Sequence, residues 1–164
     1  MQTFLPYSDF AASARVLDRR RLGKQRVEAL QVLRALTVSG YGWRRHPAVL
    51  MWCGYEEALT CYGLVVCGVW QAGGRGDTCE PSLRADFAVA TGRDAVRTQA
   101  ELAEAGELPP WLGRAELHRS HRSALLRKDP EHYGRYFSDA DPELPYLWPS
   151  SDRPERPEEQ RVSR

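Results

Sequence analysis

Apolar residues recur every three or four positions along almost the whole chain, a period that indicates amphipathic α-helices. No segment shows the sustained alternation of apolar and polar residues that is typical of strands. The stretch from His46 to Gln71 is apolar on nearly every side, which predicts a central core helix. Helices are expected from Ser8 or Asp9 to Thr37, from His46–Pro47 to Gln71, over Arg93–Ala105, over Arg114–Lys128, and from the cap at Asp129–Pro130 through Phe137.

This pattern predicts an all-α fold, a compact and bundle-like single domain of about five helices. A chain of 164 residues with 42% hydrophobic content is long enough to bury one core. Beyond Trp148 the composition changes to Pro, Ser, Glu and Arg, which bury too little apolar surface to offset the entropy lost on ordering. We therefore expect a folded domain over residues 1–148 and a disordered polar tail over residues 149–164.

The net charge of +1 is unevenly distributed along the chain. The last 27 residues, from Ser138, hold seven acidic residues against four arginines, so the preceding body has a net charge of about +4. Clusters of basic residues favour contact with phosphates more strongly than a small net charge does. The clusters are Arg15, Arg19, Arg20, Arg21, Lys24 and Arg26, then Arg44 and Arg45, then Arg114, Arg119, Arg122, Arg127 and Lys128.

The sequence argues against a membrane protein and against a zinc protein. No basic leader with an apolar region opens it, and no apolar run reaches the roughly 20 residues that a bilayer span needs. We expect a cytoplasmic protein. The four cysteines form no CxxC pair, so we expect them to be reduced and structural, and we expect no metal or other cofactor.

Residues 111–137, WLGRAELHRSHRSALLRKDPEHYGRYF, interleave arginines with histidines and aromatic rings. Arginines neutralise phosphates and flat rings stack on unpaired bases, so this composition suits a nucleic acid. Leu117, Leu125 and Leu126 fall at helical spacing, however, and the arginines then form the solvent face of an amphipathic helix. The pattern by itself favours the second interpretation.

The predicted first helix gathers the residues best suited to chemistry. At 100° per residue, Arg21, Lys24 and Glu28 share one stripe. This stripe is either a carboxylate held among cations for a reaction or an ordinary surface ion pair worth roughly a few tenths of a kcal/mol. Arg19 and Arg26 project toward the apolar side of the helix, where an arginine needs a route to solvent or an anionic ligand.

Three segments in a fixed order carry a resemblance to a known family. They are MQTFLPY with the basic helix that ends in RVEAL, then HPAVLMWCGYEEAL, then PWLGRAELHRSHRSALLRKDPEHYGRYF. From Met1 to about Trp148 the chain resembles the pyrimidine dimer DNA glycosylases, the endonuclease V family known from bacteriophage, and looks closest to a bacterial branch. The resemblance implies a compact helical enzyme that kinks duplex DNA, extrudes a base and cleaves the N-glycosidic bond.

The resemblance also implies roles for residues near the N-terminus. In the family, the N-terminal amine left after removal of the initiator methionine attacks C1′ of the deoxyribose and forms a Schiff base. A glutamate on the first helix assists, and by position Glu28 matches it, with Arg21, Lys24 and Arg26 as candidate phosphate ligands. Such a carboxylate stabilises the oxocarbenium-like charge on the sugar or activates a water.

The chain departs from the family at Gln2, where the family has a small residue, typically threonine. A bulky second residue normally blocks methionine removal, which leaves the free amine on Met1. Three routes stay open: attack by the Met1 amine, attack by the Lys24 amine, or activation of water by Glu28. The first two predict abasic-site lyase activity with a strand nick, and the third does not. A catalytically inactive relative that binds damaged, modified or bent DNA is the alternative function.

We expect the protein to be a monomer that binds double-stranded DNA, and we expect the other basic and aromatic residues to contact that DNA. His118 and His121 are spaced as in some metal sites, but a third ligand is not evident nearby. We therefore place both at the mouth of the expected DNA-binding cleft, as donors to a phosphate or a base edge. Trp43 is either a wedge beside a flipped base or a buried anchor. Tyr133 or Tyr136 is expected to offer a stacking surface, with core packing as the alternative. The expected DNA contacts are Arg19, Arg21, Arg26, Arg44, Arg45, His46, His118, His121, Arg122, Lys128, Tyr133 and Tyr136.

Overall fold

The computed structural model describes residues 1–163, and the predicted all-α fold is confirmed. This part of the chain forms eight α-helices and one 3₁₀-helix, where about five helices were expected. Its one strand-like pairing is an isolated bridge between Val38 and Val162. The α-helices are α1 (Phe10–Arg15), α2 (Arg19–Thr37), α3 (Pro47–Leu50), α4 (Glu56–Ala72), α5 (Cys79–Thr91), α6 (Gln99–Glu104), α7 (Ala115–Lys128) and α8 (Pro130–Tyr133), and the 3₁₀-helix is Glu158–Gln160.

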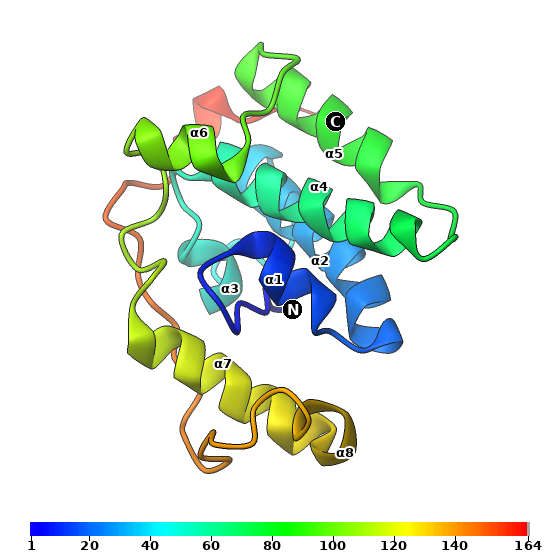
Figure 1. Cartoon of the computed structure of the whole chain (residues 1–164). Coiled ribbons are helices and arrows are strands. Elements are labelled where there is room, and N and C mark those ends of the chain that lie inside the picture. The colour runs from blue at the N-terminus through cyan, green and yellow to red at the C-terminus, as the bar shows by residue number, and fades with distance from the viewer. Residues whose placement is uncertain (164) are drawn as a thin grey trace.

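The two long helices α2 and α4 pack against each other at the centre of the molecule (Figure 1). α5 contacts both of them, while α1 and α6 pack on α4. α7 and α8 contact each other in the lower part of the view, and the N-terminus lies between them and the central helices. α4 is the core helix that the apolar pattern predicted, because Leu59 and Tyr62 are completely buried in it.

The predicted first helix is interrupted at residues 16–18, which separate α1 from α2. α2 begins here because the side chain of Asp18 accepts hydrogen bonds from the backbone N–H groups of Arg20 and Arg21. The hydroxyl of Tyr133 in α8 donates to the same carboxylate at 2.5 Å. Asp9 caps α1, as the sequence suggested. The interruption is therefore fixed by a tertiary contact that the helical period does not show.

The predicted second helix is also two helices. α3 begins after His46, whose Nδ1 accepts a hydrogen bond from the Ala48 N–H at 3.1 Å. The chain then turns through residues 51–55, where Gly54 has a φ of 74° and its backbone lies against the Arg153 side chain. A side chain at position 54 would collide with that arginine and strain the backbone, so the turn depends on glycine.

The helices after α4 agree with the sequence in part. α5 was not predicted, and it ends at Gly92, whose φ of 71° is the left-handed geometry of a helix C-terminus. The helix expected over Arg93–Ala105 is confined to α6, because Thr98 and Glu101 form a reciprocal capping box at its start. α7 and α8 start within one residue of their expected positions, although α8 ends earlier, at Tyr133.

The segment before α1 belongs to the hydrophobic core. Phe4 and Leu5 are buried in the main core cluster. The indole N–H of Trp52 donates to the hydroxyl oxygen of Thr3 at 3.0 Å, and both groups are buried. The folded core therefore fixes the position of the first residues of the chain.

Residues 149–163 pack along the helical body, so the prediction of a disordered tail was wrong for this part of it. In Figure 1 the segment, coloured orange to red, runs back along the molecule from the side of α8 to that of α5. Arg161 is 8% exposed and donates from Nη1 to the Ala35 carbonyl at 2.9 Å. Ser151 donates to the Cys53 carbonyl at 2.6 Å. Polar side chains bound to backbone carbonyls order this segment, and residue 164 lies outside the described residues.

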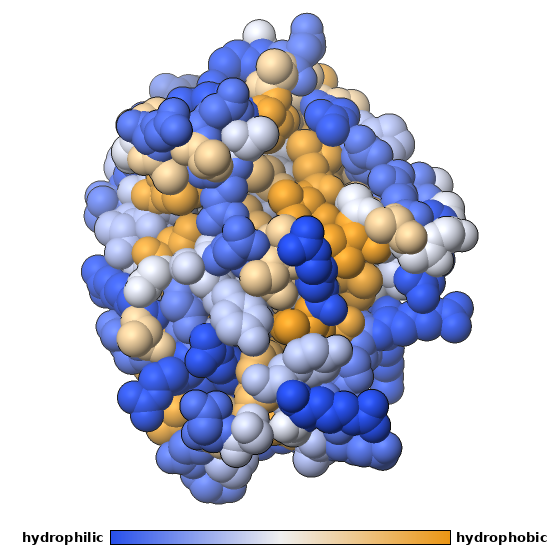
Figure 2. All heavy atoms as spheres, in the orientation of Figure 1, coloured by the Kyte–Doolittle hydropathy of each residue, from blue (hydrophilic) through white to orange (hydrophobic). Residues whose placement is uncertain are grey.

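One face of the molecule exposes an apolar area. Figure 2 shows hydrophobic residues gathered where α4 lies in Figure 1, within a largely hydrophilic surface. The partly buried apolar residues of α4 include Leu64, Val65 and Val69. Among residues 1–163, none of the helices has both the length and the apolar content needed to cross a membrane.

The four cysteines are free and buried, in agreement with the structural role expected of them. Burial raises the pKa of the Cys53 and Cys61 thiols to about 11 each, so both stay protonated at neutral pH. In the described part of the chain, His, Cys, Asp and Glu side chains form no group of three or more that could hold a metal ion.

Candidate active site

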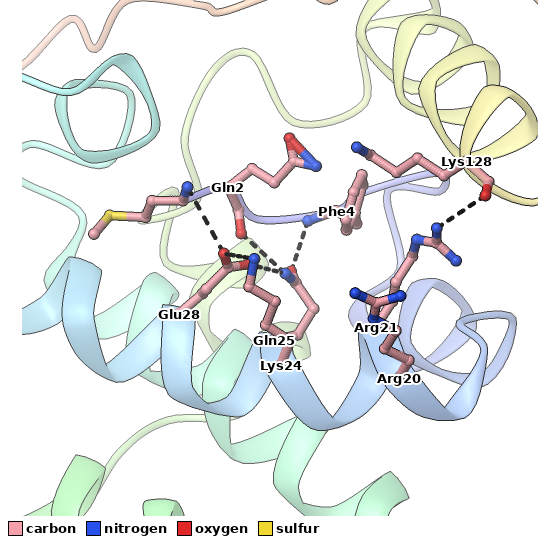
Figure 3. A pocket seen from close by; sticks show the side chains of 9 residues that line it. Gln2, Phe4, Arg20, Arg21, Lys24, Gln25, Glu28 and Lys128 are labelled. Atoms are coloured by element: carbon pink, nitrogen blue, oxygen red, sulfur yellow. Dashed lines mark hydrogen bonds and ion pairs between the residues drawn. The ribbon is translucent and has the colours of Figure 1, made fainter.

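A polar pocket of about 340 Å³ lies between the N-terminal segment, the first half of α2 and the end of α7 (Figure 3). Three residues predicted for chemistry, Met1, Lys24 and Glu28, line it together. In the close-up, Arg20, Arg21 and Lys128 form a cationic side of the pocket, across from the Glu28 carboxylate. The lining residues are Met1, Gln2, Phe4, Arg20, Arg21, Lys24, Gln25, Glu28 and Lys128.

The carboxylate of Glu28 is buried in the pocket wall and faces two amines. Its side chain is 5% exposed, and Oε1 lies 3.7 Å from the α-amine of Met1. The same oxygen lies 3.3 Å from Nζ of Lys24. The other oxygen, Oε2, accepts a hydrogen bond from Nε2 of Gln25 at 2.7 Å. The protein thus holds one carboxylate oxygen and turns the other toward the amines.

The two amines differ in how firmly they are held. Lys24 is 69% exposed and reaches Glu28 as an ordinary pair four residues apart on α2. The Met1 side chain is only 6% exposed, and its amine belongs to a chain segment that is bound to the core. The Met1 amine therefore has a defined position beside the carboxylate, whereas the Lys24 amine sits on a mobile stem.

Gln25 anchors the N-terminal segment to α2. Its Oε1 accepts hydrogen bonds from the Phe4 N–H at 2.8 Å and from the Tyr62 hydroxyl at 2.6 Å. Its Nε2 donates to the Gln2 carbonyl at 3.0 Å and also to Glu28, as the dashed lines in Figure 3 show. Both ends of this buried amide are satisfied. Gln25 therefore sets the position of the first residues relative to the carboxylate.

α7 holds the same segment from the other side. Leu5 donates its N–H to Nδ1 of His121 at 2.9 Å, and its carbonyl accepts from Nδ1 of His118 at 2.8 Å. Nε of Arg122 donates to the Pro6 carbonyl at 2.8 Å. Three side chains that were expected to contact DNA therefore bind the N-terminal backbone, and together with α2 they clamp it in place.

The two histidines of this clamp are uncharged. Nε2 of His118 accepts from the Gly113 N–H at 3.0 Å, which leaves its Nδ1 to donate. Burial lowers the pKa of His118, and it lowers that of His121 to about 3. Nε2 of His121 has no hydrogen-bond partner among the described residues. Both rings are buried and neutral, so the structure does not place them at the cleft mouth where the sequence suggested.

Comparison with known protein families gives a match for the N-terminal part of the chain. This part carries the two amines, Gln25 and Glu28. Residues 1–81 match the family model described as pyrimidine dimer DNA glycosylase. This match covers just under half of the chain, and for these residues it confirms the resemblance noted in the sequence. Neither the curated proteins nor the solved structures gave a match.

Two of the expected DNA contacts line the pocket. Arg21 is held there by Asp18, with Nη1 2.6 Å from Oδ2, and it donates to the Lys128 carbonyl at 3.1 Å. The Lys128 side chain is exposed at the cationic side of the pocket, together with Arg20, which sequence reasoning did not single out. Arg19 is exposed and does not line the pocket.

Two other arginines expected at the DNA have protein partners. Arg26 is bonded to Asp77, and its guanidinium lies 4.2 Å from the ring centroid of Trp70. The ion pair with Asp77 therefore explains why Arg26 is tolerated on the apolar side of α2. Arg44 lies 2.7 Å from a carboxylate oxygen of Glu158, which belongs to the C-terminal segment.

The two tyrosines expected as a stacking surface have different environments. Tyr133 is completely buried, and burial followed by its hydrogen bond to Asp18 raises the pKa of its hydroxyl. Burial opposes ionisation of Asp18 as well, but hydrogen bonds from Tyr133 and Arg21 outweigh it and lower the pKa of that carboxyl. Tyr133 therefore closes the core beneath α2, whereas Tyr136 is 49% exposed and accessible for stacking.

Gln25 is the site residue that the sequence analysis missed. It lies one turn from Leu22 and from Ala29 on the buried stripe of α2, where a polar side chain requires partners. The same argument directed attention to Arg19 and Arg26, which are long enough to leave the apolar side. The short amide side chain of Gln25 on the buried stripe was the better indication of a site residue.

Proposed function

We propose that this chain is a DNA glycosylase that excises a damaged or modified base of the pyrimidine-dimer type from duplex DNA. The base is extruded from the stack, the Met1 amine is the nucleophile, and Glu28 is the catalytic carboxylate. One observation carries the proposal: the α-amine of Met1 lies 3.7 Å from a buried carboxylate in a cation-lined pocket. The match of residues 1–81 to the pyrimidine dimer DNA glycosylase family model supports it.

In the proposed reaction, Glu28 takes a proton from the Met1 ammonium, and the neutral amine attacks C1′ of the deoxyribose. As the new N–C1′ bond forms, the bond from C1′ to the base breaks, and the base leaves with the electron pair and takes up a proton. The nitrogen then loses another proton, and its lone pair opens the sugar ring to give an imine while O4′ is protonated. Removal of a C2′ proton expels the 3′ phosphate, which is the abasic-site lyase step.

The way in which the two amines are held favours Met1 over Lys24 as the nucleophile. The Met1 amine is positioned by the bonds of Gln25 to Gln2 and Phe4, whereas Lys24 is exposed.

The bulky second residue fits this assignment. Because Gln2 blocks methionine removal, the free amine belongs to Met1, and it is this amine that faces the carboxylate. A chain that retains Met1 is one residue longer at the N-terminus than family members that start at a small residue. Activation of water by Glu28 is the alternative route on the same substrate, because Glu28 lines the pocket.

The cationic side of the pocket would hold the DNA strand. Arg20 and Lys128 are exposed there and are assigned to phosphates, which position the duplex without reading its sequence. Arg21 is assigned to orienting this side, since it joins α2 to the end of α7. The proposed enzyme binds double-stranded DNA as a monomer.

Borohydride trapping tests the proposal. Protein with its native N-terminus is mixed with duplexes that carry a photodimer or an abasic site, and reduction converts the imine into a covalent adduct. Mass spectrometry first establishes that Met1 is retained and then maps the adduct. We expect linkage at the Met1 nitrogen, loss of the adduct when the N-terminus is acetylated, and an unchanged adduct in Lys24→Arg.

The other outcomes select between the alternatives. An adduct at Lys24 would move the nucleophile to that residue, and base release without any adduct would support water activation by Glu28. Binding of modified duplexes with neither an adduct nor base release would identify an inactive DNA-binding relative and overturn the enzyme assignment.

A further inference from the structure

Trp43 is a large apolar side chain that the fold leaves in solvent. It lies in the loop between α2 and α3 and is 67% exposed. It is also the one non-glycine residue among residues 1–163 with a positive φ, which is 67°. A bulky side chain in this left-handed region is strained, and such outliers cluster at functional sites. The fold neither buries this ring nor relaxes its backbone.

Trp43 is the outer end of a row of aromatic rings that leads to the candidate active site. Its ring meets His46 edge-on with centroids 5.9 Å apart, and His46 meets Trp148 edge-on at 5.6 Å. Trp148 lies 4.5 Å from Tyr146, which is stacked on His121 at 4.6 Å. Because His121 belongs to the clamp on the N-terminal segment, this aromatic row connects the exposed ring to the segment that carries the amine.

The charges of the catalytic pair reach the middle of the aromatic row. Burial lowers the pKa of His46, and the charge of the Met1 amine lowers it further while Glu28 opposes both effects. Burial raises the pKa of the Tyr146 hydroxyl, and the Glu28 carboxylate adds to that rise. The row therefore lies within electrostatic reach of the pair.

The loop around Trp43 has the charge that a DNA strand requires. Arg44 and Arg45 follow it directly, and Arg45 is exposed. Arg44 is half-buried and paired with Glu158, so Arg45 is the cation of this loop that is available to a phosphate. An exposed ring beside an exposed cation matches an unpaired base next to a phosphate.

We propose that Trp43 is a wedge that enters the duplex beside the extruded nucleotide and stacks on the base left without a partner. The inference rests on the proposed function and assigns duplex opening and chemistry to different residues. Trp43 stabilises the opened duplex, while Met1 and Glu28 carry out the chemistry. The occupant of the Trp43 surface is therefore the same DNA molecule whose sugar lies in the pocket.

The test measures binding without chemistry, in a Glu28→Gln background. The affinity for a duplex with a tetrahydrofuran abasic-site analogue is compared with that for an unmodified duplex by fluorescence anisotropy. We expect Trp43→Ala to weaken binding to the analogue duplex between about fivefold and a hundredfold, with little change for the unmodified duplex. Trp43→Phe is expected to retain most of the preference, because a flat ring remains.

Two further variants separate a wedge from a structural role. Trp43→Gly removes the ring and suits the positive φ, so we expect it to unfold in urea at the same concentration as the parent or a higher one while losing the preference. Val89→Ala is the matched control, because Val89 is equally exposed but lies on α5. We expect it to change neither measurement.

The contrary outcomes are distinct. Unchanged preference in Trp43→Ala, with a Met1 adduct still trapped in the Glu28-containing enzyme, overturns the wedge and leaves the proposed function standing. Marked destabilisation of Trp43→Gly shows an anchoring role and also overturns the wedge. Failure of the parent to bind any duplex overturns both proposals.

Discussion

The α-amine of Met1 and the carboxylate of Glu28 lie 3.7 Å apart, although one begins the chain and the other lies in the middle of α2. Gln25 brings them together, because it binds the backbone of the first residues and Glu28 with the same amide group. The hydrogen bonds of Gln25 to Gln2 and Phe4 fix the start of the chain against α2.

Glu28→Gln should suppress base release without loosening the fold. The amide retains an oxygen that can accept from Gln25, but it cannot take a proton from the Met1 ammonium. We expect the single-turnover rate of base release from a photodimer duplex to fall by about 10²- to 10⁴-fold. Lys24→Gln, which removes the exposed partner of the same oxygen, should stay within a few-fold of the parent. Equal rates for the parent and Glu28→Gln would contradict the role assigned to this carboxylate.

Gln25→Met should separate the N-terminus from the carboxylate. The substitution conserves size but leaves the buried Phe4 N–H and the Gln2 carbonyl without their partner. We expect the free energy of unfolding to fall by about 1–3 kcal/mol, measured by urea denaturation. The yield of trapped adduct should fall while DNA affinity is retained. Gln31→Met, at a half-buried position of the same helix, is the control, and an equal loss of adduct there would argue against specific positioning.

Stability should depend on pH through His121. Its pKa is lowered to about 3 in the folded protein, against about 6.5 in an unfolded chain. Between these values the unfolded chain binds one more proton, so the free energy of unfolding falls as the pH falls, by about 1.4 kcal/mol per pH unit. This contribution is fully present above pH 6.5. Burial also lowers the pKa of His118, which adds to the slope in the same direction.

Urea denaturation at pH 7.5 and pH 5.5 measures this slope. His121→Gln has no titrating group at this position and should lose most of the difference between the two conditions, whatever its stability at pH 7.5. A difference as large as that of the parent would show that other groups cause the pH dependence.

A chain that ends at Trp148 should be less stable than the full chain. The truncation removes the bond of Arg161 to the Ala35 carbonyl and that of Ser151 to the Cys53 carbonyl. We expect the free energy of unfolding to fall by about 1–3 kcal/mol if one of these carbonyls is left buried and unpaired. Glu159→Ala alters an exposed residue of the same segment and should have little effect. Equal stability of the truncated and full chains would indicate that the segment contributes nothing.

Arg20→Ala and Lys128→Ala should weaken DNA binding in a salt-dependent way. Each residue is assigned to one phosphate, so each substitution should reduce the slope of log affinity against log salt by about one. The loss should be similar for modified and unmodified duplexes, measured by anisotropy between 50 and 200 mM salt. Arg84→Ala removes a charge on α5 that pairs with Glu80, and it should leave the slope unchanged.

The helical class, the core helix α4 and the stripe of Lys24 and Glu28 followed from the sequence alone. These features depend on the helical period and on residues one turn apart, which are local quantities. Family likeness added the expectation that an N-terminal amine meets Glu28. The beginning of α7 was also predictable within one residue, because its apolar residues repeat at helical spacing.

Only the tertiary structure decided what the polar residues bind. His121 accepts from Leu5, 116 positions away, and Arg161 donates to Ala35, 126 positions away. The same kind of distant contact, from Tyr133 to Asp18, interrupts the first helix. A buried polar group must find a partner, but its own neighbours in the chain do not specify which one. The sequence therefore determined where helices form, and the packed structure determined which side chains face the pocket and which ones hold the chain that enters it.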